Sequence, residues 1–260
     1  MRIDRLFRQR IGFPFDEKIN LNNLDNLLEQ IASFIPFENL CTLSGDLDAI
    51  NEITLVDKIL NRSQGGLCYD LNGILYLFLQ ENGLDVQLIR GSVYVPDFKD
   101  YSPTGRTHAA IILSIDGERF LIDTGFGGNL PLRPVPMDGT EISSPNGDFR
   151  VKQHDSEFGD YLLEMKLKYK DSDWRVGYAF DSREPVENVS DLYEMKKIIT
   201  EHPQSPFNKK PLLTRVTANG SMVLTETSFT QWKEDGVKKE EIDSERFKEL
   251  AMEFYNIELK

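Results

Sequence analysis

The chain has 260 residues, more than one average domain, and 40% of them are hydrophobic, which is enough for a sizeable core. Its formal net charge of −13 argues against nucleic acid as a partner, because binding to a phosphate backbone requires a basic surface. The amino-terminal stretch does not read as a signal peptide, and no apolar run reaches membrane-spanning length. With two cysteines and no membrane segment, the chain is expected in a reducing compartment, the cytoplasm.

The first 84 residues favour helices. Pro36 should end a first amphipathic helix, and asparagines before it suit capping. The segment ITLVDKILNR (residues 53–62) predicts a short helix, and residues 67–81 predict an apolar one that stops at Asn82-Gly83. We therefore expect a helical domain over residues 1–84, whose first helix buries Leu24, Leu27, Leu28, Ile31, Phe34 and Ile35.

Cys68 stands at the start of that apolar helix, directly after Gly65-Gly66 and one leucine. A thiol in the first turn faces unsatisfied N–H groups and the positive end of the helix dipole, which favour a thiolate. A lone cysteine is more often a small buried hydrophobe, and Cys41, with no glycine pair before it, is interpreted in that way. Cys68 is the candidate nucleophile because a base and an acid can be placed beside it.

Residues 85–188 predict a β-rich domain, in which Asp116-Gly117 signals a two-residue hairpin turn. Pairing Ile115 with Glu118 places His108 and Asp123 on one face as diagonal neighbours, with Cβ atoms about 6–7 Å apart. A carboxylate at that distance can reach an imidazole. Both faces of the hairpin are otherwise mainly apolar, so an ionisable pair there needs a reason.

The last third predicts an α/β domain over residues 189–260. A capped helix is expected at SDLYEMKKIIT, a hairpin turning at Asn219-Gly220, and a final amphipathic helix from Ser244. The charged run KEDGVKKEE (residues 233–241) is interpreted as a solvated face.

Cys68, His108 and Asp123 supply a nucleophile, a base and a group that orients the base. Their segments are SQGGLCYDLNG, TGRTHAAIIL and FLIDTGFGG, and PFENL (residues 36–40) precedes them. Together these segments resemble the arylamine N-acetyltransferase family. The similarity runs over most of the chain and is strongest in residues 36–128.

The resemblance implies an α+β multidomain fold with an N-terminal helical bundle, a central β-barrel, a C-terminal α/β lid and a cysteine-protease-like Cys-His-Asp triad. It also implies that Cys68 takes an acetyl group from acetyl-CoA and passes it to an arylamine, arylhydrazine or N-arylhydroxylamine, while His108 moves protons. Such chemistry needs no metal, and the sequence has no ligand-spaced His/Cys cluster. By the same resemblance, Phe126 walls the acceptor pocket, and the contacts to CoA are Thr104, Gly105, Gly125, Phe126, Gly127 and, in the lid, Thr214.

Two positions depart from the family pattern. The family usually has Arg before the glycine pair and Glu two residues after the cysteine, where this chain has Gln64 and Asp70. That arginine partners the glutamate of the PFENL segment, here Glu38. Because a buried unpaired carboxylate is costly, we expect a substitute, either the Gln64 amide or a cation, with Arg62 as the first candidate.

Two other functions remain open on the same residues. An amide synthase or a Cys-His-Asp hydrolase would use the triad with another acyl donor. A catalytically inactive relative would bind acyl-CoA or a protein partner in the old cleft. The natural amine, the preferred donor and the oligomeric state are not encoded in any motif of the chain.

Overall fold

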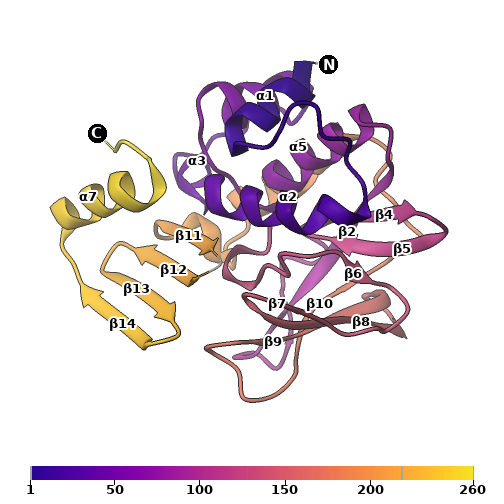
Figure 1. Cartoon of the computed structure of the whole chain (residues 1–260). Helices are drawn as coiled ribbons and strands as arrows, with labels where there is room; N and C mark the ends of the chain where they lie inside the picture. Colours follow the sequence, from indigo (N-terminus) through magenta and orange to yellow (C-terminus); the bar gives the residue numbers. More distant parts are fainter. Residues whose placement is uncertain (1, 218, 260) are drawn as a thin grey trace.

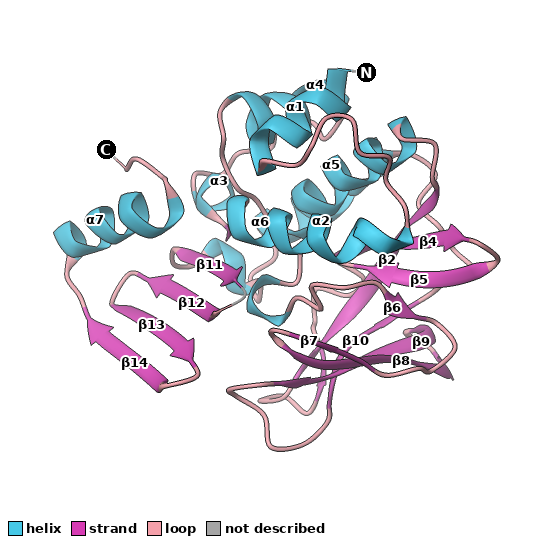
Figure 2. Ribbon diagram, viewed as in Figure 1, coloured by secondary structure: helices cyan, strands magenta, loops and turns pink. Residues whose placement is uncertain are grey.

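The computed structural model describes residues 2–217 and 219–259. Figure 1 shows helices gathered above a strongly curved sheet, with a smaller sheet and the C-terminal helix to one side. The same three parts are distinct in Figure 2, where the helices of the first part lie over one end of the curved sheet. The expected α+β architecture of helical bundle, barrel and α/β lid is confirmed.

The helical part differs from expectation at its start and in its middle. A first helix, α1, was not predicted from the sequence, and the segment expected as one helix begins as α4 and continues as a π-helix over Val56–Asn61. The helix that starts at Cys68 ends at Glu81, and Gly83 adopts the left-handed conformation (φ 77°) that its stop signal predicted. The helices are α1 (Arg2–Ile11), α2 (Leu21–Phe34), α3 (Leu40–Leu43), α4 (Glu52–Leu55) and α5 (Cys68–Glu81).

The curved sheet is antiparallel, and in the described residues its strands run in the order β6-β5-β4-β2-β10-β9-β8-β7, with β3 beside β2. Strands β7 and β8 were not predicted from the sequence. The bounds are β2 (Asp85–Val95), β3 (Asp100–Tyr101), β4 (His108–Ile115), β5 (Glu118–Ile122), β6 (Val135–Pro136), β7 (Ile142–Ser144), β8 (Gly147–Ser156), β9 (Gly159–Leu167) and β10 (Arg175–Phe180), with a 3-10 turn at Gly127–Asn129.

The register of the β4–β5 hairpin is the predicted one. Ile115 pairs with Glu118 and Ile111 with Ile122. One face of the hairpin packs on the helices and the other fills the barrel, so both faces are buried as their apolar residues indicated. The hairpin thereby joins the two largest cores of the described chain.

The lid sheet has the strand order β1-β11-β12-β13-β14, and α7 packs on it. Gly220, which was predicted to lie in the hairpin turn, is instead paired with Thr217 at the start of β12, and Ala218 lies outside the described residues. The charged run is solvent-exposed, as predicted, and most of it forms the edge strand β14, whose charges suit an edge. The elements are β1 (Phe37–Glu38), β11 (Leu212–Thr217), β12 (Gly220–Thr225), β13 (Ser228–Lys233), β14 (Gly236–Glu241) and α7 (Ser244–Tyr255).

Two elements pack against a different part of the structure from the one in which the sequence placed them. Helix α6 (Leu192–Glu201), which follows a 3-10 turn at Val189–Asp191, packs with α5 in the helical core. Strand β1, from the helical segment, pairs with β11 of the lid. The domain limits 1–84, 85–188 and 189–260 stay a prediction.

Candidate active site

The three residues predicted to form a triad lie together and are buried. Cys68 is the first residue of α5, His108 begins β4, and Asp123 follows β5. His108 Nε2 lies 2.7 Å from Asp123 Oδ2, and the Cys68 thiol donates to the Thr107 carbonyl at 3.4 Å. Since Nε2 faces the carboxylate, Nδ1 is the ring nitrogen left to exchange a proton with Cys68.

The environment of His108 favours its charged form. Burial by itself would lower the pKa of His108. The negative charge of Asp123, its hydrogen bond and the interaction with Cys68 outweigh that effect and raise the pKa of His108 to about 10. The imidazolium form of His108 is therefore favoured at neutral pH.

Asp123 is held by four donors. Its Oδ1 accepts from Asn72 Nδ2 (2.9 Å) and from the Gly125 N–H (2.8 Å), and its Oδ2 accepts from His108 and from the Tyr178 hydroxyl (3.0 Å). These contacts fix both oxygens of the carboxylate, so the imidazole that it orients has one favoured position.

Sequence reasoning missed Asn72 and Tyr178. Asn72 lies one helical turn after Cys68, and this spacing was the available signal. Its amide donates to the Ala109 carbonyl (2.7 Å) and accepts from the Thr124 N–H (2.9 Å), so it ties α5 to both strands of the hairpin. The hydroxyl of Tyr178 comes from β10, which no local motif connects with Asp123.

Gly125 allows α5 to approach the hairpin closely. A Cβ built on Gly125 would lie 2.5 Å from the Cys68 Cα and 2.8 Å from the Asn72 Nδ2. No side chain fits at those distances, so a glycine is required where the loop crosses the helix start. From the sequence, Gly125 is expected to contact CoA. The structure shows that the close packing of the loop on the helix also requires a glycine at this position.

A cavity of about 270 Å³ opens above the Cys68 side chain, between the helices, the barrel and the lid. Of the predicted contacts to CoA, Gly105 lies outside its lining and forms a turn (φ 71°) before His108. The hydroxyl of Thr214 is buried and has no hydrogen-bond partner in the described residues, so it is free to bind a ligand. The predicted residues that do line the cavity are Thr104, Gly125, Phe126, Gly127 and Thr214.

Aromatic rings form the cavity wall next to the imidazole. The Phe126 ring lies 5.0 Å from the ring of His108 and 5.1 Å from that of Tyr178. The wall is therefore apolar where the thiol opens into the cavity. Cys41 is absent from the lining, and burial raises the pKa of its thiol.

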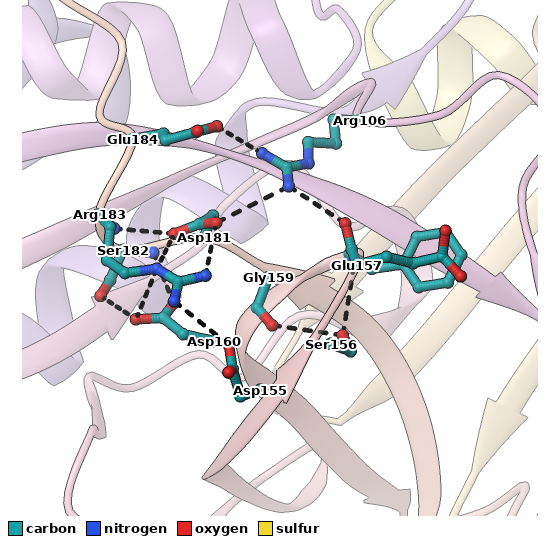
Figure 3. Close-up of polar contacts among 11 residues, drawn as sticks. Arg106, Asp155, Ser156, Glu157, Gly159, Asp160, Asp181, Ser182, Arg183 and Glu184 are labelled. Carbon is teal, nitrogen blue, oxygen red and sulfur yellow. Dashed lines mark hydrogen bonds and ion pairs between the residues drawn. The ribbon is translucent and has the colours of Figure 1, made fainter.

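The segment that leads into His108 is held by hydrogen bonds inside the protein and by an ion pair and a hydrogen bond at its surface. Within the protein, the Thr104 hydroxyl bonds to that of Thr107 at 2.9 Å. On the outside, Arg106 reaches Glu184 at 2.7 Å and donates to the Glu157 carbonyl at 3.3 Å, within the wider charge network that Figure 3 shows. These contacts position the Thr107 carbonyl, which accepts from the Cys68 thiol.

The expectation that Arg62 neutralises Glu38 is wrong. Arg62 is exposed and pairs with Asp57 at 2.8 Å. The cation is instead Lys58, which the π-helix turns inward: its ammonium contacts Asp70 at 2.7 Å. Burial raises the pKa of Glu38, and the charge of Lys58 opposes that rise.

The Gln64 amide is no substitute either. Among the residues described, the Gln64 side chain donates no hydrogen bond to Glu38, and its amide oxygen is buried without a partner. Glu38 takes its direct hydrogen bond from the Leu40 N–H at 2.6 Å. The residue types at 58 and 70 therefore compensate for the arginine and glutamate that the family usually has.

In the described residues, no three His, Cys, Asp or Glu side chains are grouped to hold a metal, and no helix is long and apolar enough to cross a bilayer. A thiol and an imidazole line an apolar cavity, and a carboxylate is buried behind the imidazole, an arrangement that is suited to acyl transfer through a cysteine.

Comparison with known proteins identifies the family. A family model described as N-acetyltransferase matches residues 20–260. An acetyltransferase of Bacillus subtilis, YvcN, is 40% identical over 242 residues, which are 93% of this chain and 92% of YvcN. The chain belongs to the arylamine N-acetyltransferase family.

Solved structures agree with that assignment. An arylamine N-acetyltransferase of Bacillus cereus, described with a unique Cys-His-Glu catalytic triad, is 36% identical and matches over 100% of both chains with a TM-score of 0.93. The Mycobacterium marinum enzyme, solved in complex with CoA, is 25% identical and matches 98% of this chain and 92% of its own with a TM-score of 0.83. In the present chain the carboxylate beside His108 is that of Asp123.

Gly125→Ala tests the close approach of loop and helix. Because the added methyl would meet the Cys68 backbone, we expect the free energy of unfolding to fall by about 1–3 kcal/mol, as for other overpacked sites, and the reactivity of Cys68 to fall with it. Urea unfolding and thiol alkylation measure the two effects. Gly128→Ala is the matched control, since its added methyl has ordinary room and should leave stability unchanged. Equal stability of both variants would contradict the requirement.

Lys58→Met tests the identity of the buried cation. Removing one partner leaves Asp70 and Glu38 without a counter-charge, so we expect a loss of about 3–5 kcal/mol in the free energy of unfolding. Arg62→Ala removes a solvent-exposed pair and should cost at most about 1 kcal/mol. Urea denaturation of the two variants compares them directly, and a larger loss for Arg62→Ala would reverse the assignment.

Proposed function

We propose that this chain transfers the acetyl group of acetyl-CoA to small arylamines, arylhydrazines or N-arylhydroxylamines through a thioester on Cys68. The observation that carries the proposal is the contact of His108 with Asp123 beside a cysteine at the first turn of α5, on the floor of the cavity. Membership of the arylamine N-acetyltransferase family supports the choice of donor and acceptor. The roles of the individual residues are inferred from their chemistry.

In the first half-reaction the Cys68 proton resides on His108 Nδ1, and the thiolate attacks the acetyl carbonyl. The carbonyl oxygen becomes an oxyanion, which the N–H groups of Cys68 and Tyr69 at the start of α5 are suited to stabilise, because the carbonyl of Leu67 is bound by the later residues Asp70 and Leu71. When the tetrahedral intermediate collapses, the bond from carbon to the CoA sulfur breaks. CoA leaves as a thiol, having taken the proton from His108.

In the second half-reaction the acceptor nitrogen attacks the thioester carbonyl. His108, now neutral, accepts the proton that the nitrogen loses, and Cys68 leaves as the thiolate. Asp123 stabilises the imidazolium in both halves, because its charge is buried beside the ring. The apolar wall at Phe126 suits an aromatic acceptor.

We assign the contacts with acetyl-CoA to the part of the cavity between the hairpin and the lid. The unpartnered Thr214 hydroxyl is available to the pantetheine arm, and N–H groups of the loop at Phe126 and Gly127 are suited to anionic oxygens. The N–H of Gly125 is already bound to Asp123, so Gly125 contributes to the cavity wall as a residue without a side chain. Thr104 also lines the cavity. We further infer a cytoplasmic location, since Cys41 and Cys68 are both free thiols.

Incubation with acetyl-CoA should add one acetyl group to the intact protein, on Cys68. Only this thiol has a base beside it, whereas burial raises the pKa of Cys41. Intact-mass spectrometry followed by peptide mapping locates the group, and a later addition of an arylamine should remove it.

The Cys68→Ala variant is the control for this experiment and should remain unmodified. Acetylation at Cys41 would exclude the proposed nucleophile. A wild-type protein that is acetylated by other activated esters but never by acetyl-CoA would point to an amide synthase or hydrolase instead.

Asp123→Asn should reduce the alkylation of Cys68 at neutral pH by about 100-fold, a typical contribution of a positioned base. The charge of Asp123 is the main influence that raises the pKa of His108, so its loss lowers that pKa and removes the proton acceptor of the thiol. In wild type, the imidazolium of His108 should be lost as the pH rises towards 10. Iodoacetamide rates measured against pH report both effects.

Tyr178→Phe is the matched comparison, since it removes one hydrogen bond to Asp123 but leaves the charge in place. Its alkylation profile should move less than that of Asp123→Asn. Superimposable profiles for wild type and Asp123→Asn would make Asp123 a structural residue only.

A further inference from the structure

Lys170 lies in the loop after β9, beside the part of the cavity wall formed by Gly128 and Asn129. Its ammonium is 4.1 Å from the ring centroid of Trp232, on lid strand β13. A Cβ built on Gly128 would lie 3.4 Å from the same nitrogen. Gly128 and Asn129 line the cavity that holds Cys68, so the ammonium stands next to its wall where barrel and lid meet.

This cation has no counter-ion. Among the described residues no carboxylate lies within 4.0 Å of the Lys170 ammonium. The neighbouring cation, Arg175, is already paired with Asp171 at 2.8 Å and also donates to the Asn129 side chain at 3.3 Å. Desolvation and then the charge of Arg175 lower the pKa of Lys170 to about 8. An anion placed here would relieve both effects.

We propose that Lys170, supported by the face of Trp232, binds a phosphate group of acetyl-CoA at the junction of barrel and lid. This inference rests on the proposed function and names a residue that sets the affinity for the donor.

The charge of the whole protein favours a cationic residue at this site. With a net charge of −13, the molecule repels an anionic donor at long range, so local positive charge must offset that repulsion. An ammonium has three donors, and the Trp232 ring satisfies none of them with an oxygen, so all remain available to phosphate oxygens. The ring also restricts the side chain to one place before the donor arrives, which lowers the entropy lost on binding.

One cavity connects Cys68 with the wall next to Lys170. The thioester carbon must meet the Cys68 sulfur on the cavity floor, and the phosphates follow at the other end of the pantetheine arm. The cavity is lined by Cys68 at one place and by Gly128 and Asn129 at another, so one extended ligand can contact both. The absence of a side chain at Gly128 leaves the path to Lys170 open.

The test compares donors with and without phosphates. The rate of Cys68 acetylation is measured with acetyl-CoA, acetyl-dephospho-CoA and S-acetylpantetheine for wild type, Lys170→Gln and Lys170→Arg. Lys239→Gln on exposed strand β14 is the control that makes the same change in net charge away from the cavity.

For Lys170→Gln we expect kcat/KM for acetyl-CoA to fall about tenfold, the lower range for a charged hydrogen bond, with the loss mainly in KM. S-acetylpantetheine should react at the wild-type rate, Lys170→Arg should recover most of the loss, and Lys239→Gln should behave as wild type. A loss that persists with acetyl-dephospho-CoA assigns the contact to the diphosphate, and a loss confined to acetyl-CoA assigns it to the 3′-phosphate.

Equal losses with all three donors would overturn the proposal, because they would show that Lys170 supports packing of the lid. An unchanged KM for acetyl-CoA would also overturn it while leaving the proposed acetyl transfer intact. Failure of the proposed function has a different signature, since wild type would then accept acetyl from none of the donors.

Discussion

The buried carboxylate of Asp123 is the constraint around which the site is built. A charge away from water is tolerated only when it is paired and its oxygens are hydrogen-bonded, and Asp123 meets both conditions. Its donors come from helix α5 through Asn72, from β4 through His108 and from β10 through Tyr178. One residue therefore links the helical part to two strands of the barrel. Because Cys68 is the first residue of α5, these contacts also fix its position relative to His108.

A second set of buried charges holds the other side of the same helix start. Asp70 accepts from the Leu67 N–H at 3.1 Å and pairs with Lys58, so it caps the helix and anchors it to the π-helix. Glu38 lies within the field of the same lysine. This arrangement explains how the chain keeps the architecture of its family without the usual arginine and glutamate. The positive charge near Glu38 and Asp70 is carried by Lys58, since residue 64 is an uncharged glutamine.

The sequence predicts those parts of the site that local geometry determines. The Asp-Gly turn sets the register that brings His108 to Asp123, and helical spacing places Cys68 in a first turn. Contacts between distant segments escape such reasoning: Tyr178 and Lys58 reach the site through sheet order and a π-helical turn. Strands β7 and β8 were missed because a polar, half-exposed segment carries only weak alternation.

The short strand β1 lies between the segment that leads into Cys68 and the lid sheet. The Glu38 N–H donates to the Gly66 carbonyl at 3.0 Å, two residues before Cys68, and Phe37 pairs with Thr214 of β11. A two-residue segment thus lies between the loop that leads into α5 and the strand that carries an unpartnered hydroxyl into the cavity. Because backbone hydrogen bonds resist stretching, the distance from Cys68 to Thr214 is set by three adjacent segments. Separating the lid from the helices would break these hydrogen bonds, so the pairing of β1 with β11 holds both sides of the cavity together.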